Sequence, residues 1–205
     1  MGIDWIRGVP FCFCLTLCGA QLFAQSELRG TAPAGTASAL EASVGYVFMS
    51  MASAETPRLN LVGVDANGVL QFAPRWGAMV DLTFARAANV PGTGHSDKVF
   101  SALAGPEFFL IDRQRGNVFV HALAGAGLVD SAFLAADGLE FHGYAARFSF
   151  ALGAGAEVTV HGPIALRVAG DYQRTTFVNS VLAPIPQNNV RLGTSLVYRF
   201  GRRVQ

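Results

Sequence analysis

Three adjacent residues carry the side-chain types of a hydrolytic triad. His95, Ser96 and Asp97 supply an imidazole, a hydroxyl and a carboxylate, the groups that an esterase or a lipid deacylase uses. Consecutive residues cannot easily converge on one reacting atom, however, and the surrounding "PGTGHSD" is rich in turn residues. We therefore interpret this segment as a solvated outer loop and predict no catalytic residues.

Two further patterns suggest bound ligands. Glu107 and His121 could form a metal pair, but two ligands are too few for a metal site, so we interpret His121 as an interior histidine with a polar partner. Gly125-Ala126-Gly127 and Gly153-Ala154-Gly155 each repeat half of a nucleotide-binding fingerprint. No helical pattern follows either of them, so we predict packing spacers on strands, and neither a cofactor nor a metal.

The composition limits the class of protein that must position these residues. The chain has 205 residues, of which 51% are hydrophobic and 14% charged, with a mean hydropathy of +0.36. An average soluble domain has roughly 25% charged residues. A helical membrane span needs about 20 consecutive apolar residues, and no segment after residue 24 provides them. The formal charge is only +1 and the arginines are scattered, which argues against nucleic acid as a partner.

The N-terminal segment has the pattern of an export signal. An apolar run follows Arg7 and ends in small residues near Ala24, which predicts a signal peptide over 1–24. A buried N-terminal helix is one alternative. A lipid attached at Cys18 is another, although bulky Leu17 precedes that cysteine. All three cysteines lie in this segment, so the exported chain has no disulfide and no thiol catalyst. Residues 25–38 are rich in small residues and predict a flexible periplasmic leader.

Alternation of apolar and polar residues recurs along the rest of the chain and predicts strands. We expect eight of them, near 40–51, 60–72, 76–86, 98–111, 118–129, 147–160, 164–177 and 189–200. The connections alternate in length: three are tight, around Pro74, at 112–117 and at 161–163, and four are longer, around Thr56, at 87–97, at 130–146 and at 178–188. Short turns at one end and long loops at the other predict an all-β, eight-stranded antiparallel up-and-down transmembrane β-barrel.

The two faces of these strands differ in chemistry. One face has no charged residue and places aromatics near strand ends, as in Trp76 and Phe200, whereas charges and glycines share the other face. A soluble barrel such as a lipocalin would put the charges outside. The glycine-rich charged face and the aromatic girdles instead favour lipid outside and a polar, packed lumen.

The inward charges predict a network inside the lumen. Its members are Asp65, Asp81, Glu107, His121, Glu157, Arg167, Asp171 and Arg191. We expect Arg167 to bridge Glu157 and other carboxylates, because an unpaired charge in a narrow lumen costs several kcal/mol. Counting from the short turns, Arg191 should lie above Asp171, near the loop end. Eight strands leave a lumen that side chains can fill, so a wide pore is not expected.

The last strand resembles the C-terminal assembly signal of bacterial outer-membrane barrels. That signal is carried here by Arg191, Gly193, Leu196, Tyr198 and Phe200. Residues 39–201, with segments such as "VFVHALAGAG", resemble the OmpA/OmpX-like eight-stranded membrane domain and related small barrels of the porin family; 202–205 form a tail. The resemblance implies a Gram-negative cell outer membrane, with outer-membrane lipids and lipopolysaccharide, the barrel assembly machinery and periplasmic chaperones as partners.

This family resemblance says little about activity. We expect a non-enzymatic outer-membrane protein with a structural or surface-interaction role through its outer loops. A narrow gated channel for ions or small solutes is the second interpretation, with Arg167 in its gate, and a lipid-modifying barrel enzyme is the third.

Overall fold

The computed structural model describes residues 39–52, 58–87, 96–113, 115–134, 140–178 and 184–200. Its side chains are described over the same ranges, except at 130–134, 140–145, 176–178 and 184–186. The predicted signal peptide, leader and tail, and His95 of the triad-like segment, lie outside the described residues. Within the described part of the chain, no helix is long and apolar enough to cross a membrane.

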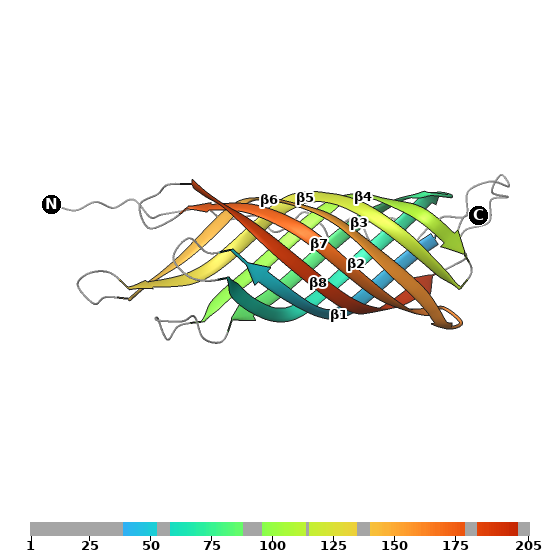
Figure 1. The fold of residues 1–205 in the computed structure, drawn as a ribbon, viewed down its shortest axis with the longest axis horizontal. Coiled ribbons are helices and arrows are strands. Elements are labelled where there is room, and N and C mark those ends of the chain that lie inside the picture. The colour runs from blue at the N-terminus through green and yellow to red at the C-terminus, as the bar shows by residue number, and fades with distance from the viewer. Residues whose placement is uncertain are drawn as a thin grey trace, which may run out of the picture. The chain divides into compact units, whose positions relative to one another are not determined.

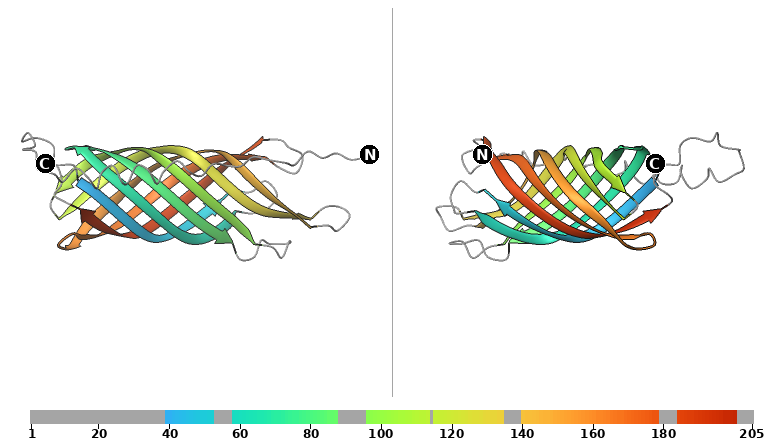
Figure 2. Two further views of the ribbon diagram at one scale, coloured as in Figure 1. Left: turned by 180° about the vertical axis from the view of Figure 1, so that it is seen from behind. Right: turned by 45° about the vertical axis from the view of Figure 1, so that its right-hand side comes forward.

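Eight antiparallel strands form one closed barrel, as the alternating sequence predicts. They are β1 (Ala39–Met51), β2 (Leu59–Ala73), β3 (Trp76–Ala87), β4 (Asp97–Arg113), β5 (Gly116–Leu134), β6 (Glu140–His161), β7 (Ile164–Val178) and β8 (Pro184–Phe200). Each strand pairs with its sequence neighbours, and β8 closes the barrel on β1 (Figures 1 and 2). The predicted fold class is confirmed.

The short turns lie together at one end of the barrel, which we call the turn end. Pro74 and Arg75 connect β2 to β3, and Gly162 and Pro163 connect β6 to β7. Gly162 has φ of 53°, a conformation that glycine adopts without the steric cost of a side chain. Because the number of strands is even, Ala39 and Phe200 also lie at the turn end.

The predicted loop over 130–146 is wrong for most of its length. β5 runs to Leu134 and β6 starts at Glu140, and these two residues are still paired. The pairing of β4 with β5 ends at Asp130, and that of β6 with β7 ends at Ser149. Ser131–Leu134 and Glu140–Gly143 therefore form a two-stranded extension, the β5–β6 ribbon, which reaches past the other strands at the loop end (Figure 1, left).

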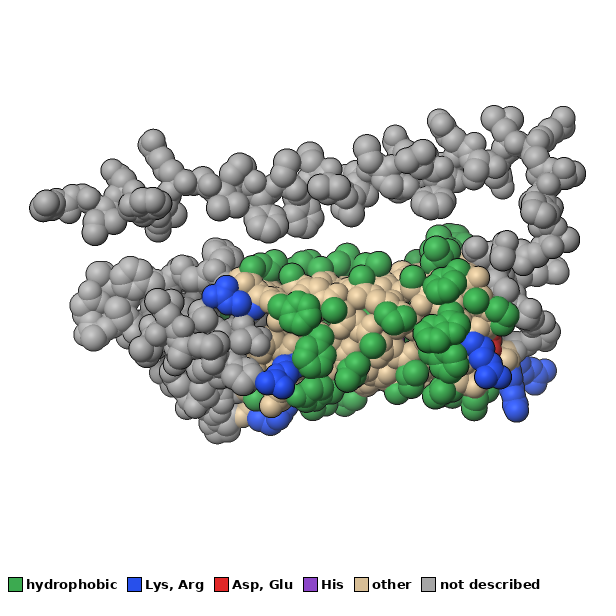
Figure 3. Space-filling model, turned by 90° about the horizontal axis from the view of Figure 1, so that it is seen from above, with side chains coloured by type: hydrophobic (Ala, Val, Ile, Leu, Met, Phe, Trp, Pro, Cys, Tyr) green, Lys and Arg blue, Asp and Glu red, His purple; other side chains and the backbone are tan. Residues whose placement is uncertain are grey.

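The outer surface of the barrel is apolar, as the sequence predicts. Val44, Leu152, Val168 and Leu196 are all more than half exposed, although each is a strand residue. Figure 3 shows such side chains covering one side of the barrel, with arginine and lysine toward its two ends. An apolar surface that surrounds a closed barrel in this way is typical of barrels that face lipid.

Candidate functional site

The lumen holds the charged residues, because every second residue of a strand points inward. All eight members of the predicted network are buried, and none is more than 8% exposed. The structure divides most of them into two separate clusters.

The first cluster lies toward the turn end and joins four strands. Arg167 on β7 donates from Nη2 to Glu157 Oε2 at 2.8 Å and to Glu41 Oε2 at 3.0 Å. Arg199 on β8 pairs with Glu157 Oε1 and, at 3.3 Å, with Glu41 Oε1. The Arg167 guanidinium carbon also lies 4.9 Å from the centre of the Phe119 ring. We call Glu41, Glu157, Arg167 and Arg199 the turn-end cluster; its two carboxylates and two guanidiniums balance in charge.

The second cluster, the mid-lumen cluster, is centred on Arg191. Its Nε donates to Asp171 Oδ2 at 2.7 Å, and its Nη1 to Asp81 Oδ1 at 2.6 Å and to the Thr83 hydroxyl. His121 Nε2 and Asp171 Oδ1 are 2.6 Å apart. Arg191 is level with Asp171, its cross-strand partner, and not nearer the loop end as we predicted. The prediction placed the start of β8 at residue 189, but the strand starts at Pro184.

Two of the predicted residues stand apart from both clusters. Glu107 faces His121 across the β4–β5 pair, but neither of its carboxylate oxygens has a hydrogen-bond partner among the described residues. Asp65 accepts one hydrogen bond, from Asn67 Nδ2 to Oδ2 at 2.7 Å. A small cavity of about 20 Å³ lies between the turn-end and mid-lumen clusters, with Asp65 in its wall.

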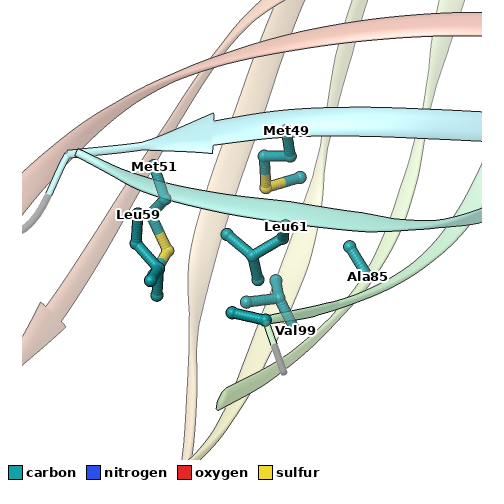
Figure 4. Close-up of a cluster of buried hydrophobic side chains, with 7 residues drawn as sticks. Met49, Met51, Leu59, Leu61, Ala85 and Val99 are labelled. Atoms are coloured by element: carbon teal, nitrogen blue, oxygen red, sulfur yellow. The ribbon is translucent and has the colours of Figure 1, made fainter. Parts of the chain in front are cut away.

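The lumen also contains apolar residues that the sequence analysis did not place there. Towards the loop end, seven apolar side chains form a cluster on the inner face of strands β1 to β4 (Figure 4). They are Met49, Met51, Leu59, Leu61, Ala85, Ala87 and Val99. On the opposite wall, Gln173 Nε2 donates to the Ser149 hydroxyl at 3.0 Å. Met49, Leu61, Ser149 and Gln173 are all fully buried, so side chains pack closely at this level of the lumen.

Glycines make room for these side chains. A Cβ atom at Gly153 would overlap Asp171 Oδ1 and His121 Nε2, and one at Gly155 would overlap the Phe119 ring. The Gly-Ala-Gly motif of β6 therefore provides packing space, as predicted, and leaves the His121–Asp171 contact intact.

Sequence reasoning missed three contributors to the site. Glu41 and Arg199 belong to the turn-end cluster, and Phe119 packs beneath Arg167. Glu41 and Arg199 could have been found from the sequence. Once β8 is paired with β1, these two residues are direct cross-strand partners. Among the described residues, no three His, Cys, Asp or Glu side chains are arranged to hold a metal ion.

Arginine and lysine make up the most exposed charged side chains of the described residues. Asp97 at the loop end and Asp112 at the turn end are partly exposed, and the other described carboxylates are buried. At the loop end the exposed cations are Arg58, Arg86, Lys98, Arg147 and Arg174, which we call the loop-end cations. Arg58 is held in place by Ser50 Oγ at 2.9 Å and by the Ser50 carbonyl at 2.8 Å.

No family model and no curated protein matches this chain. Solved structures do match its fold. Neisserial surface protein A has a TM-score of 0.62 at 12% identity, over 81% of this chain and 99% of that one. The attachment invasion locus protein of Yersinia pestis, in complex with the heparin analogue sucrose octasulfate, has a TM-score of 0.54 at 22% identity. That match covers 80% of this chain and 99% of the other. The outer membrane protein OprG of Pseudomonas aeruginosa has a TM-score of 0.57 at 10% identity. That match covers 82% of this chain and 98% of the other. The chain thus has the fold of small outer-membrane β-barrels.

Proposed function

We propose that this chain is an integral protein of the cell outer membrane that acts through its loop end as a surface-interaction protein. The observation that carries the proposal is the β5–β6 ribbon, in which Ser131–Leu134 and Glu140–Gly143 continue beyond the strands that flank them. An extension of this kind does not serve to close the barrel. It presents backbone and side chains to whatever lies outside the membrane.

The expected ligand is polyanionic. The loop-end cations lie on several strands, and the one carboxylate described among them, Asp97, is less exposed than they are. A surface of one charge attracts a ligand of the opposite charge over a Debye length, about 8 Å at physiological ionic strength. Lipopolysaccharide phosphates and sulfated glycans both have the required charge, and the heparin analogue bound by the Yersinia pestis protein is a sulfated glycan.

The test uses the full chain in lipid nanodiscs with immobilised heparin as the probe. We expect binding that weakens as salt is raised and is lost when Arg86, Arg147 and Arg174 of the loop-end cations are replaced together by glutamine. Arg75→Gln, which removes an exposed cation at the turn end, is the matched control and should bind as wild type does. Heparin binding equal in this triple variant and in the wild-type protein would refute a role for the loop-end cations.

The outer apolar surface of the barrel supports three further partners as proposals: the barrel assembly machinery, membrane lipids and periplasmic chaperones. Leu196, Tyr198 and Phe200 lie on the outer face of β8, roughly half exposed, where an assembly machine could contact them before the strand pairs with β1. Lipids contact the apolar outer surface. Periplasmic chaperones would hold the same surface before insertion. We assign no reaction to the chain.

A narrow gated channel is the second candidate function, and the buried ion pairs are the observation that favours it. Rearrangement of Arg167 away from Glu157 would open the turn-end cluster, leaving the loop-end layer as the remaining barrier. Single-channel recording in a planar bilayer, comparing wild type with Arg167→Ala, decides between the two. A silent wild-type bilayer with inserted protein supports the surface role, and discrete steps altered by the substitution support the channel.

A further inference from the structure

The three tight hairpins at the turn end share one irregularity. The pairing of their strands shifts at Phe72, Leu110 and Val160, so each hairpin has a β-bulge at that residue. All three are large apolar side chains and at least half exposed on the outer surface. In β4 the next residue, Ile111, is about half exposed as well. The bulges therefore concentrate apolar side chains on the outer surface where the strands end.

An arginine follows two of these bulges. Arg75 lies three residues after Phe72, in the turn between β2 and β3, and Arg113 lies three residues after Leu110, at the end of β4. Both side chains are exposed, and among the described residues neither guanidinium is held by a hydrogen bond or an ion pair. The turn between β6 and β7 has no arginine or lysine. The arginines therefore lie beside β3 and β4, which are neighbours in the barrel.

Two aromatic rings lie next to these arginines. Trp76 follows Arg75 directly and is the cross-strand partner of Phe108, with ring centres 4.8 Å apart in an edge-to-face arrangement. The Phe109 backbone N–H donates to the Arg75 carbonyl at 3.0 Å, which holds the β2–β3 turn beside β4. Figure 3 shows arginine or lysine beside large apolar side chains at the turn end, on the right. The outer surface of β3 and β4 thus combines cations with aromatic rings.

Positive charge is in excess at this surface. Arg75, Arg113 and Arg115 are exposed there, and Asp112 is the one partly exposed carboxylate described at this end. Asp112 Oδ2 lies 3.4 Å from Nε2 of Gln71, a fully buried side chain, so that carboxylate is turned toward the lumen. Cations above an apolar, aromatic surface fit a molecule with a phosphate at one end and hydrocarbon at the other.

We propose that the outer surface of β3 and β4 at the turn end binds a glycerophospholipid with an anionic headgroup. Arg75 and Arg113 contact its headgroup, because guanidiniums form charge-assisted hydrogen bonds with phosphate oxygens. Its acyl chains lie across Trp76, Phe108 and Leu110, which a soluble anion would leave uncovered. The short turns of outer-membrane barrels face the periplasm, so the lipid belongs to the leaflet on that side. The site lies at the end opposite the loop-end cations and does not depend on the surface role proposed above.

Trp76 is the reporter for the test. The chain has two tryptophans, Trp5 and Trp76, so Trp5→Phe leaves Trp76 as the single one. The full chain is refolded into phosphatidylcholine vesicles that contain the same minor fraction of brominated phosphatidylglycerol or of brominated phosphatidylcholine. Bromine on an acyl chain quenches tryptophan fluorescence at short range only. We expect stronger quenching by the anionic lipid, equivalent to binding about fivefold tighter for each arginine.

Variants of the two arginines test their role. Arg75→Gln combined with Arg113→Gln should abolish the preference for the anionic lipid, and each alone should weaken it about fivefold. Arg86→Gln combined with Arg174→Gln removes two exposed arginines at the loop end, and this matched control should keep the preference. In vesicles of phosphatidylcholine alone, both double variants should unfold as wild type does, because no anionic lipid is bound there.

Three results would overturn the proposal. Equal quenching of wild type by the two brominated lipids would mean ordinary contact with the bilayer only. A preference that survives in the Arg75 and Arg113 double variant would place the anionic lipid elsewhere on the barrel. Loss of the preference when inorganic phosphate replaces chloride at equal ionic strength would assign the two arginines to a soluble anion.

Discussion

Replacing Arg167 by methionine tests whether the turn-end cluster holds the barrel together. Arg167 is 2% exposed and donates two hydrogen bonds to Glu157 and one to Glu41. The substitution keeps most of the side-chain volume but leaves two buried carboxylates facing one guanidinium, that of Arg199. Breaking a buried ion pair from one side costs about 3–5 kcal/mol, because the remaining charge is uncompensated. We expect the free energy of unfolding to fall by that amount.

The assay is urea unfolding of the refolded protein in lipid vesicles, followed by tryptophan fluorescence, because Trp76 lies on the lipid-facing surface at the turn end. Arg167→Met combined with Glu157→Gln should recover part of the loss, since it removes a charge of each sign. Arg113→Met, an exposed arginine at the turn end, is the control and should change stability by less than about 0.5 kcal/mol. A loss below about 1 kcal/mol for Arg167→Met, or no recovery in the double variant, would refute the reasoning.

Three further substitutions test the packing of the barrel. The first two use the same urea titration, and Trp76→Ala uses urea unfolding followed by circular dichroism, because it removes the fluorescent reporter. Gly153→Ala should cost about 1–3 kcal/mol because its Cβ meets Asp171 and His121, whereas Gly68→Ala, with no atom within 4 Å of its Cβ, should change little. Leu61 is fully buried in the apolar cluster at the loop end, so Leu61→Ala should lower the free energy of unfolding by about 2–5 kcal/mol. Val62 faces lipid, so Val62→Ala should lower it clearly less. Equal losses would mean that the apolar cluster is loosely packed. Trp76→Ala removes the edge-to-face contact with Phe108, whose ring centre lies 4.8 Å away. The free energy of unfolding should fall by about 0.5–1.5 kcal/mol more than the lost buried area explains. A loss no larger than that of Phe72→Ala would contradict this expectation.

The sequence was sufficient to predict which residues point inward, because a period of two assigns every strand residue to a face. It failed where both faces are apolar. Around Val47, Phe48 and Met49 alternation gives no contrast, so the apolar layer at the loop end was not visible. It also failed where a contact depends on the height of one strand against another. The level of Arg191 beside Asp171 follows from register and from the start of β8, which alternation does not specify.

The same reasoning indicates what the buried charges contribute to the fold. A slip of two residues between β1 and β8 would preserve the inward and outward alternation, so hydrophobicity alone selects poorly between registers. Such a slip would move Arg199 about 7 Å along Glu41 and break the turn-end cluster, at about 3.4 Å per residue. Glu41, Glu157, Arg167 and Arg199 lie on β1, β6, β7 and β8, so their ion pairs span the junction where the barrel closes. The observed register brings both carboxylates against both guanidiniums. We therefore expect the turn-end cluster to favour the observed register of closure over a two-residue slip, a role that requires no solute to pass through the lumen.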